Sequence, residues 1–322
     1  MNTDHIIGQS PLIAGMKRIL AGGRIVHAYL FTGPAGAGKK TMSGLFAQAL
    51  LCTGQGNKPC RQCIVCRQFQ SGNHPDVIRI KKPVDKTAIV VDQIRELQGI
   101  VKVKPYQAGK RVCFIEQAHL MTEQAQNALL KTLEEPPSHT LFFLLADNTN
   151  TLLSTILSRC QHFRIGSMSG EDISEILERR LSISRQDAAV YAALSQGNPG
   201  KAISLAEDDT FRHNREILIK GFSQAGSAGI LELYDIFSRN KDRKEELLDI
   251  LQIWIRDLLI LKETGEWNLV VNLDQTHLLK RQVSRFTSAA LRDMIKNIEE
   301  SRRMLKNNSN YQLTVESLLL SF

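Results

Sequence analysis

The first group of residues that could take part in chemistry is a glycine-rich loop. Residues 28–33 form an apolar run, and the loop after it reads G-P-A-G-A-G-K-K-T before a helical pattern starts. In such a loop the backbone N–H groups face inward around phosphates, and the lysine reaches the outer phosphates. The start of the next helix adds its positive end. The sequence therefore predicts a P-loop that binds nucleotide phosphates through Gly33, Gly36, Gly38, Lys39, Lys40 and Thr41.

One position of this loop departs from the motif. After Lys39 the motif has a serine or threonine whose hydroxyl holds Mg²⁺, but this chain has Lys40. Thr41 does not replace that hydroxyl, because one residue along a helix turns the side chain by about 100°. Two adjacent ammonium groups also repel Mg²⁺. Phosphates can still bind here, with ATP and ADP both open as ligands, but the placement of magnesium is impaired.

A second apolar run, residues 112–116, ends in Glu116. P-loop ATPases hold Mg²⁺ with an acid at the end of such a strand. In many of them a glutamate follows and orients the attacking water. Here the next residue is Gln117, whose amide cannot accept the proton of that water. We therefore expect a degenerate nucleotide site, including Glu116, that hydrolyses ATP poorly by itself.

Four of the six cysteines cluster in the sequence with the spacing C-x7-C-x2-C-x2-C: Cys52, Cys60, Cys63 and Cys66. Thiolates two residues apart can bind one metal ion together, and four of them close a tetrahedral shell. A closed shell has no position for a substrate, so the spacing predicts structural zinc. The alternative is a set of free cysteines.

The composition is that of a globular protein, with 43% hydrophobic and 23% charged residues. No apolar run reaches the roughly 18 residues of a membrane span, and the first residues do not resemble a signal peptide, so we expect a cytoplasmic protein without membrane contact. The net charge of +8 suits contact with the phosphates of a nucleotide or nucleic acid, but it equally suits a basic soluble surface.

Short apolar runs alternate with helical patterns over the first 166 residues, which predicts an α/β domain with a parallel sheet. The later sequence reads as helices only. We expect an α/β P-loop domain at 1–166, a three-helix lid at 167–208 and an all-α collar for oligomerisation at 209–322. The zinc-binding insertion falls at about 52–72. The expected strands are 28–33, 76–81, 112–116, 140–146 and 160–165, and the helices between them are 39–52, 87–101, 122–134 and 150–157.

These features together resemble the bacterial clamp-loader members of the AAA+ ATPases. The most specific stretches are N-A-L-L-K-T-L-E-E-P-P at 127–137 and S-R-C at 158–160. The resemblance also covers shorter motifs: Ile7-Gly8-Gln9, His74-Pro75-Asp76, Glu116-Gln117-Ala118-His119, Gly197-Asn198-Pro199-Gly200, and Asn308 with Asn310.

The resemblance implies a place in a five-membered ring that opens a sliding clamp and sets it on primed DNA during replication. In that family the arginine of the S-R-C motif reaches the γ-phosphate bound by the neighbouring subunit. Arg159 would be this arginine finger, acting in trans. A guanidinium suits the role because it stabilises the charge spread over a transferring phosphoryl group. The alternative is that Arg159 forms an ordinary surface ion pair.

Two kinds of subunit in this family fit the chain: the ATP-hydrolysing motor of the gamma/tau type, and a subunit that keeps the fold and the finger but has lost its own ATP site. The sequence departs from the motor pattern at Lys40, at Gln117 and at Gly200, where motor subunits carry a phosphate-sensing arginine. These losses affect the chain's own site, whereas Arg159 serves a neighbour. We therefore expect the non-hydrolysing type. A third hypothesis is a separate zinc-containing DNA-binding protein with a vestigial P-loop.

Overall fold

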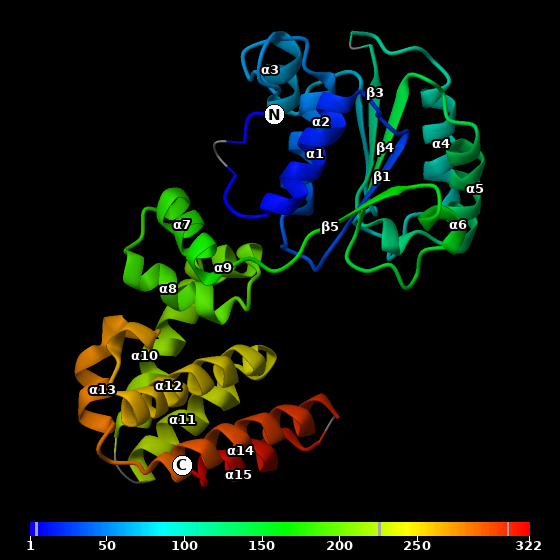
Figure 1. Ribbon diagram of the computed structural model, residues 1–322. Helices are drawn as coiled ribbons and strands as arrows, with labels where there is room; N and C mark the ends of the chain where they lie inside the picture. Colours follow the sequence, from blue (N-terminus) through cyan, green and yellow to red (C-terminus); the bar gives the residue numbers. More distant parts are fainter. Residues whose placement is uncertain (4–5, 108, 225–226, 308) are drawn as a thin grey trace. The chain divides into compact units, whose positions relative to one another are not determined.

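The computed structural model describes residues 1–3, 6–107, 109–224, 227–307 and 309–322 (Figure 1). It divides into two compact units, Met1–Met168 and Ser169–Phe322. The first boundary lies close to the predicted end of the α/β domain, while the division of the later residues into a lid and a collar stays a prediction. Asn308 of the resemblance lies outside the described residues.

The described part of the first unit contains a five-stranded parallel sheet with strand order β2-β3-β4-β1-β5. The α/β prediction is confirmed, and each strand falls within a residue or so of its expected range. The strands are β1 (Ala28–Thr32), β2 (Val77–Ile80), β3 (Arg111–Ile115), β4 (Thr140–Ala146) and β5 (Gln161–Arg164).

Helices cover both faces of this sheet (Figure 1). One face packs against α1 (Ser10–Gly22), α2 (Lys39–Leu51) and α3 (Ile64–Ser71). The other packs against α4 (Val91–Val101), α5 (Glu123–Glu134) and α6 (Ser154–Leu157). Burial on both sides explains why β1, β3 and β4 read as nearly continuous apolar runs.

The sequence analysis missed α1 and α3 and began α4 and α6 too early. The start of α1 does carry a signal, because Pro11 lies at the second helical position, where its missing N–H costs nothing. The start of α3 is capped by the Cys63 side chain, which accepts a hydrogen bond from the Cys66 N–H. A cysteine is not among the usual capping residues, so sequence reasoning had little to detect there.

Aromatic rings fill the core between the sheet and α2. Phe143 of β4 lies 5.3 Å from Tyr29 and 5.2 Å from Phe114, measured between ring centroids. Phe46 of α2 packs edge-on against Tyr29 at 5.0 Å. All four rings are buried. This cluster holds α2, and with it the P-loop, against the carboxyl ends of the strands.

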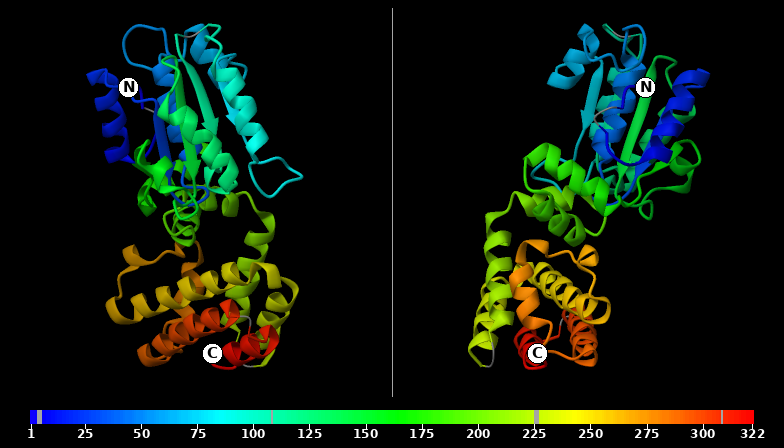
Figure 2. Two further views of the ribbon diagram at one scale, coloured as in Figure 1. Left: turned by 90° about the vertical axis from the view of Figure 1, so that its right-hand side faces the viewer. Right: turned by 60° about the vertical axis from the view of Figure 1, so that its left-hand side comes forward.

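The second unit is helical throughout its described residues, and Figure 2 shows α12 lying alongside α14. Trp254 is its largest fully buried side chain, and the indole N–H donates to Gln282 Oε1 at 3.0 Å. No helix in the described chain is both long and apolar enough to cross a membrane. The helices are α7 (Gly170–Leu181), α8 (Arg185–Leu194), α9 (Pro199–Ala206), α10 (Asp209–Ser223), α11 (Ser227–Arg239), α12 (Lys244–Thr264), α13 (Thr276–Gln282), α14 (Ser288–Lys306) and α15 (Tyr311–Leu319).

Phe143→Ala tests the role of the aromatic core. Removing a fully buried ring loses transfer free energy and leaves a cavity, so we expect the free energy of unfolding of the first unit to fall by about 3 to 5 kcal/mol. Urea denaturation followed by far-UV circular dichroism measures this. The control is Tyr106→Ala, whose ring is 89% exposed and whose loss should change stability by less than about 0.5 kcal/mol. Equal effects of the two substitutions would contradict the assignment of the core.

Candidate functional site

The glycine-rich loop connects β1 to α2, as a P-loop requires. Gly36 and Gly38 adopt left-handed backbone conformations, with φ of 81° and 96°, and Gly38 is the N-cap of α2. Side chains at these positions would strain the loop. Lys39 Nζ donates to the carbonyl oxygens of Gly33 and Pro34 at 2.7 and 2.8 Å. The loop lysine thus folds back over the loop itself.

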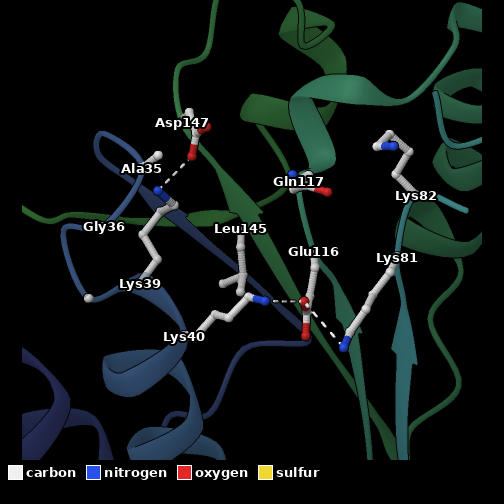
Figure 3. Close-up of a pocket in the computed structure, with 11 residues that line it drawn as sticks. Ala35, Gly36, Lys39, Lys40, Lys81, Lys82, Glu116, Gln117, Leu145 and Asp147 are labelled. Atoms are coloured by element: carbon white, nitrogen blue, oxygen red, sulfur yellow. Dashed lines mark ion pairs between the residues drawn. The ribbon is translucent and has the colours of Figure 1, made fainter. Parts of the chain in front are cut away.

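The Lys39 ammonium also forms an ion pair with Asp147, with 2.7 Å between Nζ and Oδ1 (Figure 3). Asp147 directly follows β4, and its backbone N–H donates to Nδ1 of His119 at 3.1 Å. Sequence reasoning did not select Asp147. The available signal was its position as the first polar residue after a central buried strand, where parallel sheets place functional side chains.

Glu116 directly follows β3 and is almost fully buried, with 3% of its surface exposed. Its carboxylate lies 2.7 Å from Lys40 Nζ, 3.3 Å from Arg79 Nη1 and 4.0 Å from Lys81 Nζ. A buried carboxylate needs such compensation, because the interior solvates charge poorly. The ammonium of Lys40 is the closest of these three cations to Glu116.

Arg79 and Lys81 were not selected from the sequence, although their spacing of two residues places them on one side of the extended chain at β2. The Arg79 guanidinium also lies 4.3 Å from the centroid of the Phe114 ring. This stacking fixes the guanidinium next to Glu116, since an arginine is attracted to an aromatic face.

These groups surround a cavity of about 410 Å³ (Figure 3). Gln117 lines it with a left-handed backbone, φ 56°, directly after Glu116. Thr41 is exposed and lines a separate cavity together with Arg61 and Phe69, so it does not supply the missing magnesium hydroxyl. The first cavity is lined by Ala35, Gly36, Gly38, Lys39, Lys40, Lys81, Lys82, Glu116, Gln117, Leu145 and Asp147.

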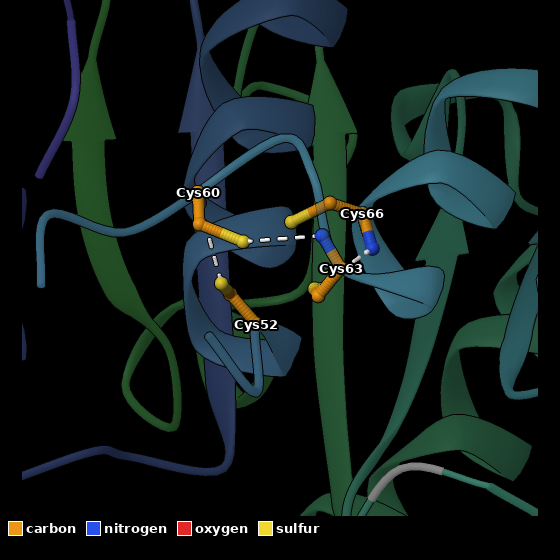
Figure 4. A group of neighbouring side chains, drawn as sticks. All are labelled: Cys52, Cys60, Cys63 and Cys66. Carbon is orange, nitrogen blue, oxygen red and sulfur yellow. Dashed lines mark hydrogen bonds between the residues drawn. The ribbon is translucent and has the colours of Figure 1, made fainter. Parts of the chain in front are cut away.

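The four clustered cysteines come together in space, with their sulfur atoms all within 4.8 Å of one another (Figure 4). A tetrahedral zinc site with bonds of about 2.3 Å brings its sulfurs to about 3.8 Å, so a small contraction would close the shell. The residues fit a metal ion chemically as well, because thiolates are ligands for zinc. The structure thus brings together all the residues predicted from the spacing, namely Cys52, Cys60, Cys63 and Cys66.

Backbone N–H groups point at these sulfurs. The Cys60 N–H donates to Cys52 Sγ, the Cys63 N–H to Cys60 Sγ and the Cys66 N–H to Cys63 Sγ, at 3.3 to 3.4 Å. Burial raises the pKa of the Cys63 thiol, but hydrogen bonds from the Cys66 N–H and from Thr53 outweigh it and lower the pKa to about 6. Burial raises the pKa of Cys66. Donors of this kind stabilise thiolates, the form that binds metal.

Arg159 lies between α6 and β5, where its guanidinium is one-third exposed. Its Nη2 contacts Oε1 of the half-exposed Glu134 at 2.8 Å, and its Nη1 donates to the Thr155 carbonyl at 3.0 Å. The surface ion pair weighed as the alternative is therefore present within this chain. Such exposed pairs contribute little stability, so Arg159 can be released to another partner at low cost.

Lys201 is the residue next to Gly200, where motor subunits carry the phosphate-sensing arginine, and its side chain pairs with an acid of the second unit. Lys201, in the first turn of α9, has its Nζ 3.3 Å from Asp249 Oδ2 of α12. Asp249 also accepts a hydrogen bond from Arg302 of α14 at 2.9 Å. Gly200 has no side chain. The network ties α9 to the helices that follow it in the second unit.

Comparisons with known proteins agree with this geometry. Residues 8–169 match the family model described as DNA polymerase III, delta subunit, and residues 210–322 match its C-terminal counterpart. The DNA polymerase III subunit delta' of Bacillus subtilis is 31% identical over 92% of this chain and 91% of its own length. That of Haemophilus influenzae is 32% identical over 72% of this chain and 70% of its own. The chain belongs to the DNA polymerase III delta-prime family.

The resemblance to bacterial clamp-loader proteins described in the sequence analysis is therefore confirmed at the level of the family. Among solved structures, the Thermotoga maritima RuvB Holliday junction branch migration motor matches with a TM-score of 0.45 and 18% identity, over 81% of this chain and 78% of that one. The described residues form a P-loop domain followed by helices. Two observations support this fold, namely the strand order of the sheet and the membership of the family.

Glu134→Gln tests whether Arg159 is free to be released. Because both side chains are solvated, we expect the free energy of unfolding to change by less than about 1 kcal/mol. Glu135→Gln, the exposed neighbour, is the matched control. Thermal and urea denaturation of both variants measure the difference. A loss of 3 kcal/mol or more for Glu134→Gln alone would make the ion pair structural and Arg159 unavailable to a partner.

Proposed function

We propose that this chain is the delta-prime-type subunit of the DNA polymerase III clamp loader, which hydrolyses little ATP itself and donates Arg159 to a neighbouring ATPase subunit. The observation that carries the proposal is an asymmetry. The Lys40 ammonium lies 2.7 Å from Glu116, where a motor would hold magnesium, whereas the Arg159 guanidinium is one-third exposed and paired with the half-exposed Glu134.

The alternative, a gamma/tau-type motor, needs Mg²⁺ bound between a loop hydroxyl and the acid after β3, and a base for the attacking water. The loop hydroxyl is replaced by Lys40, and Glu116 is neutralised by that lysine. Gln117 cannot act as the base. In a motor the lid would also present an arginine, but Lys201 is paired with Asp249. These contacts support the non-hydrolysing subunit over the motor.

The proposed ring contains delta and gamma/tau subunits as partners, in a hetero-pentamer joined through the helical collar. Through that complex the chain would contact the sliding clamp and primer-template DNA at the replication machinery in the cytoplasm. A finger supplied in trans can raise the rate of phosphoryl transfer by about 10³-fold or more. The chain would therefore contribute to catalysis in a site formed with its neighbour and not in its own cavity.

The cysteine cluster is proposed to hold one structural zinc ion. It links the end of α2 to α3, since Cys52 follows α2 while Cys63 and Cys66 start α3. Gly54 packs against the cluster so closely that a Cβ there would lie 2.5 Å from Cys60 Sγ. When bound, the ion would supply four bonds in place of the hydrophobic core that so short a segment lacks.

Arg159→Ala tests the finger. In a ring reconstituted with delta, gamma/tau, clamp and primed DNA, we expect ATP turnover at the adjoining site to fall by about 10³-fold. The total ATP turnover of the ring should then fall by the fraction that this one site contributes. Arg164→Ala removes an exposed arginine of β5 from the same region and should leave turnover unchanged. Steady-state phosphate release measures both. Assembly of each variant ring is verified by size-exclusion chromatography.

Two results would contradict the proposed function. One is a normal rate of ATP turnover in the assembled Arg159→Ala ring, which would show that Arg159 is not an arginine finger. The other is turnover of about 1 s⁻¹ or more by the isolated chain, an ordinary enzymatic rate that would make it a motor.

Zinc content tests the cysteine site. We expect one zinc per chain in the purified protein, lost in Cys63→Ser because a hydroxyl is a poor substitute for a thiolate ligand. Gly54→Ala should also weaken metal retention, since its Cβ displaces Cys60. Cys160→Ala, which changes a cysteine outside the cluster, should retain the metal. Atomic emission on dialysed protein measures all four, and a full zinc complement in Cys63→Ser would exclude the tetrahedral four-cysteine site.

A further inference from the structure

The cavity beside the P-loop combines a complete set of phosphate-binding groups with no vacant place for magnesium. Lys39, Lys40, Lys81 and Lys82 line it together with Glu116 and Asp147, so its described lining carries more positive than negative charge. Its volume of about 410 Å³ is of the size that holds a small-molecule ligand.

We propose that this cavity binds nucleoside di- and triphosphates in their magnesium-free form, with the Lys40 ammonium acting as a built-in cation where motor subunits use Mg²⁺. In the structure Lys40 already joins the P-loop helix to Glu116 across the cavity, at 2.7 Å (Figure 3). The ammonium keeps further N–H donors for a phosphate oxygen, so it bridges the acid and the ligand as a metal ion would.

The phosphate-binding groups are in place. Gly36 and Gly38 have the left-handed conformations that turn the loop N–H groups inward, and the 13-residue helix α2 begins at Lys39. Lys81 and Lys82 line the side of the cavity opposite the loop, where Lys81 extends toward Glu116 (Figure 3). Lys39 Nζ is held by carbonyl oxygens and Asp147, and a phosphate would replace these acceptors with a more strongly charged one.

Magnesium does not fit the same donor set. The ion requires oxygen ligands at about 2.0 to 2.1 Å in near-octahedral geometry. Glu116 Oε2 is already the acceptor for Lys40, and Lys81 lies 4.0 Å from the same oxygen. A divalent cation placed there would be repelled by both ammonium groups, which lie within 4.0 Å of the Glu116 carboxylate. The nucleotide would therefore bind in this cavity without magnesium.

This requirement sets a preference among ligands. ATP holds Mg²⁺ more tightly than ADP does, so in magnesium-containing solution a larger share of ADP is metal-free. We therefore expect the filled cavity to hold ADP without hydrolysis. Such a ligand would order the loop and α2 next to the cysteine cluster, because binding to the folded state stabilises it by mass action.

Calorimetric titration of the full chain with ADP tests the proposal. At matched ionic strength, we expect binding in EDTA to be at least tenfold tighter than in excess MgCl₂. Lys40→Thr restores the hydroxyl of the motif and removes the cation closest to Glu116, while Arg79 and Lys81 stay beside it, so in that variant the preference for EDTA should be lost. Lys82→Thr removes a cation of the same cavity that contacts the carbonyls of Pro83 and Lys86 instead of Glu116, and it should weaken binding while keeping the preference for EDTA.

A second measurement holds even if Lys40→Thr does not fold. With Mn²⁺ in place of Mg²⁺, the wild-type chain should withdraw metal-free ADP from the Mn²⁺–ADP complex, so the electron paramagnetic resonance signal of free Mn²⁺ should rise and no protein-immobilised Mn²⁺ should appear. Absence of ADP binding in EDTA, tighter binding of the wild type in MgCl₂, or immobilisation of Mn²⁺ by the wild type would each overturn the proposal. These assays use the isolated chain, so their failure leaves the Arg159 test in the assembled ring unaffected.

Discussion

The ion pair between Lys40 and Glu116 is the constraint on which the site depends. Glu116 is buried at the end of a central strand, and a carboxylate in that position needs a cation. In an ATPase the cation is exchangeable magnesium, which arrives and leaves with the nucleotide. Here it is tethered to the P-loop helix by a covalent side chain. One substitution therefore changes what the pocket can bind and also neutralises the acid that would have held the metal.

The parallel sheet makes this pair possible. Strand order β2-β3-β4-β1-β5 places β3 and β4 next to each other and β1 beside β4. The carboxyl ends of these strands meet at one edge of the sheet. Lys40, which follows β1, therefore pairs with Glu116 after β3, and the adjacent Lys39 pairs with Asp147 after β4. Arg159 lies just before β5 with its side chain one-third exposed, where it contacts Glu134, the Thr155 carbonyl and the Ser158 hydroxyl. The cavity beside the P-loop and Arg159 therefore each have their own acidic partner, Glu116 with Asp147 for the one and Glu134 for the other.

Much of this was accessible from residue patterns. Strands β1, β3 and β4 were predicted within a residue or so because burial on both faces leaves a continuous apolar run. Helix α3 was missed because its N-cap is Cys63, which is not a usual capping residue and whose sulfur accepts a hydrogen bond from the Cys66 N–H. Asp147, Arg79 and Lys81 were missed because a single charged residue near a strand end is indistinguishable from ordinary surface charge until its neighbours are known.

The sequence by itself determined the P-loop, the missing magnesium hydroxyl, the cysteine spacing and the resemblance to clamp-loader subunits, since each of these is written in residues close together along the chain. Only the tertiary structure decided that the ammonium of Lys40 reaches Glu116, that Lys201 is paired with Asp249, and that Arg159 is paired with the half-exposed Glu134. The physical reason is that these pairings join residues 25 to 76 positions apart. Their partners are chosen by strand order and helix packing, which no local pattern encodes.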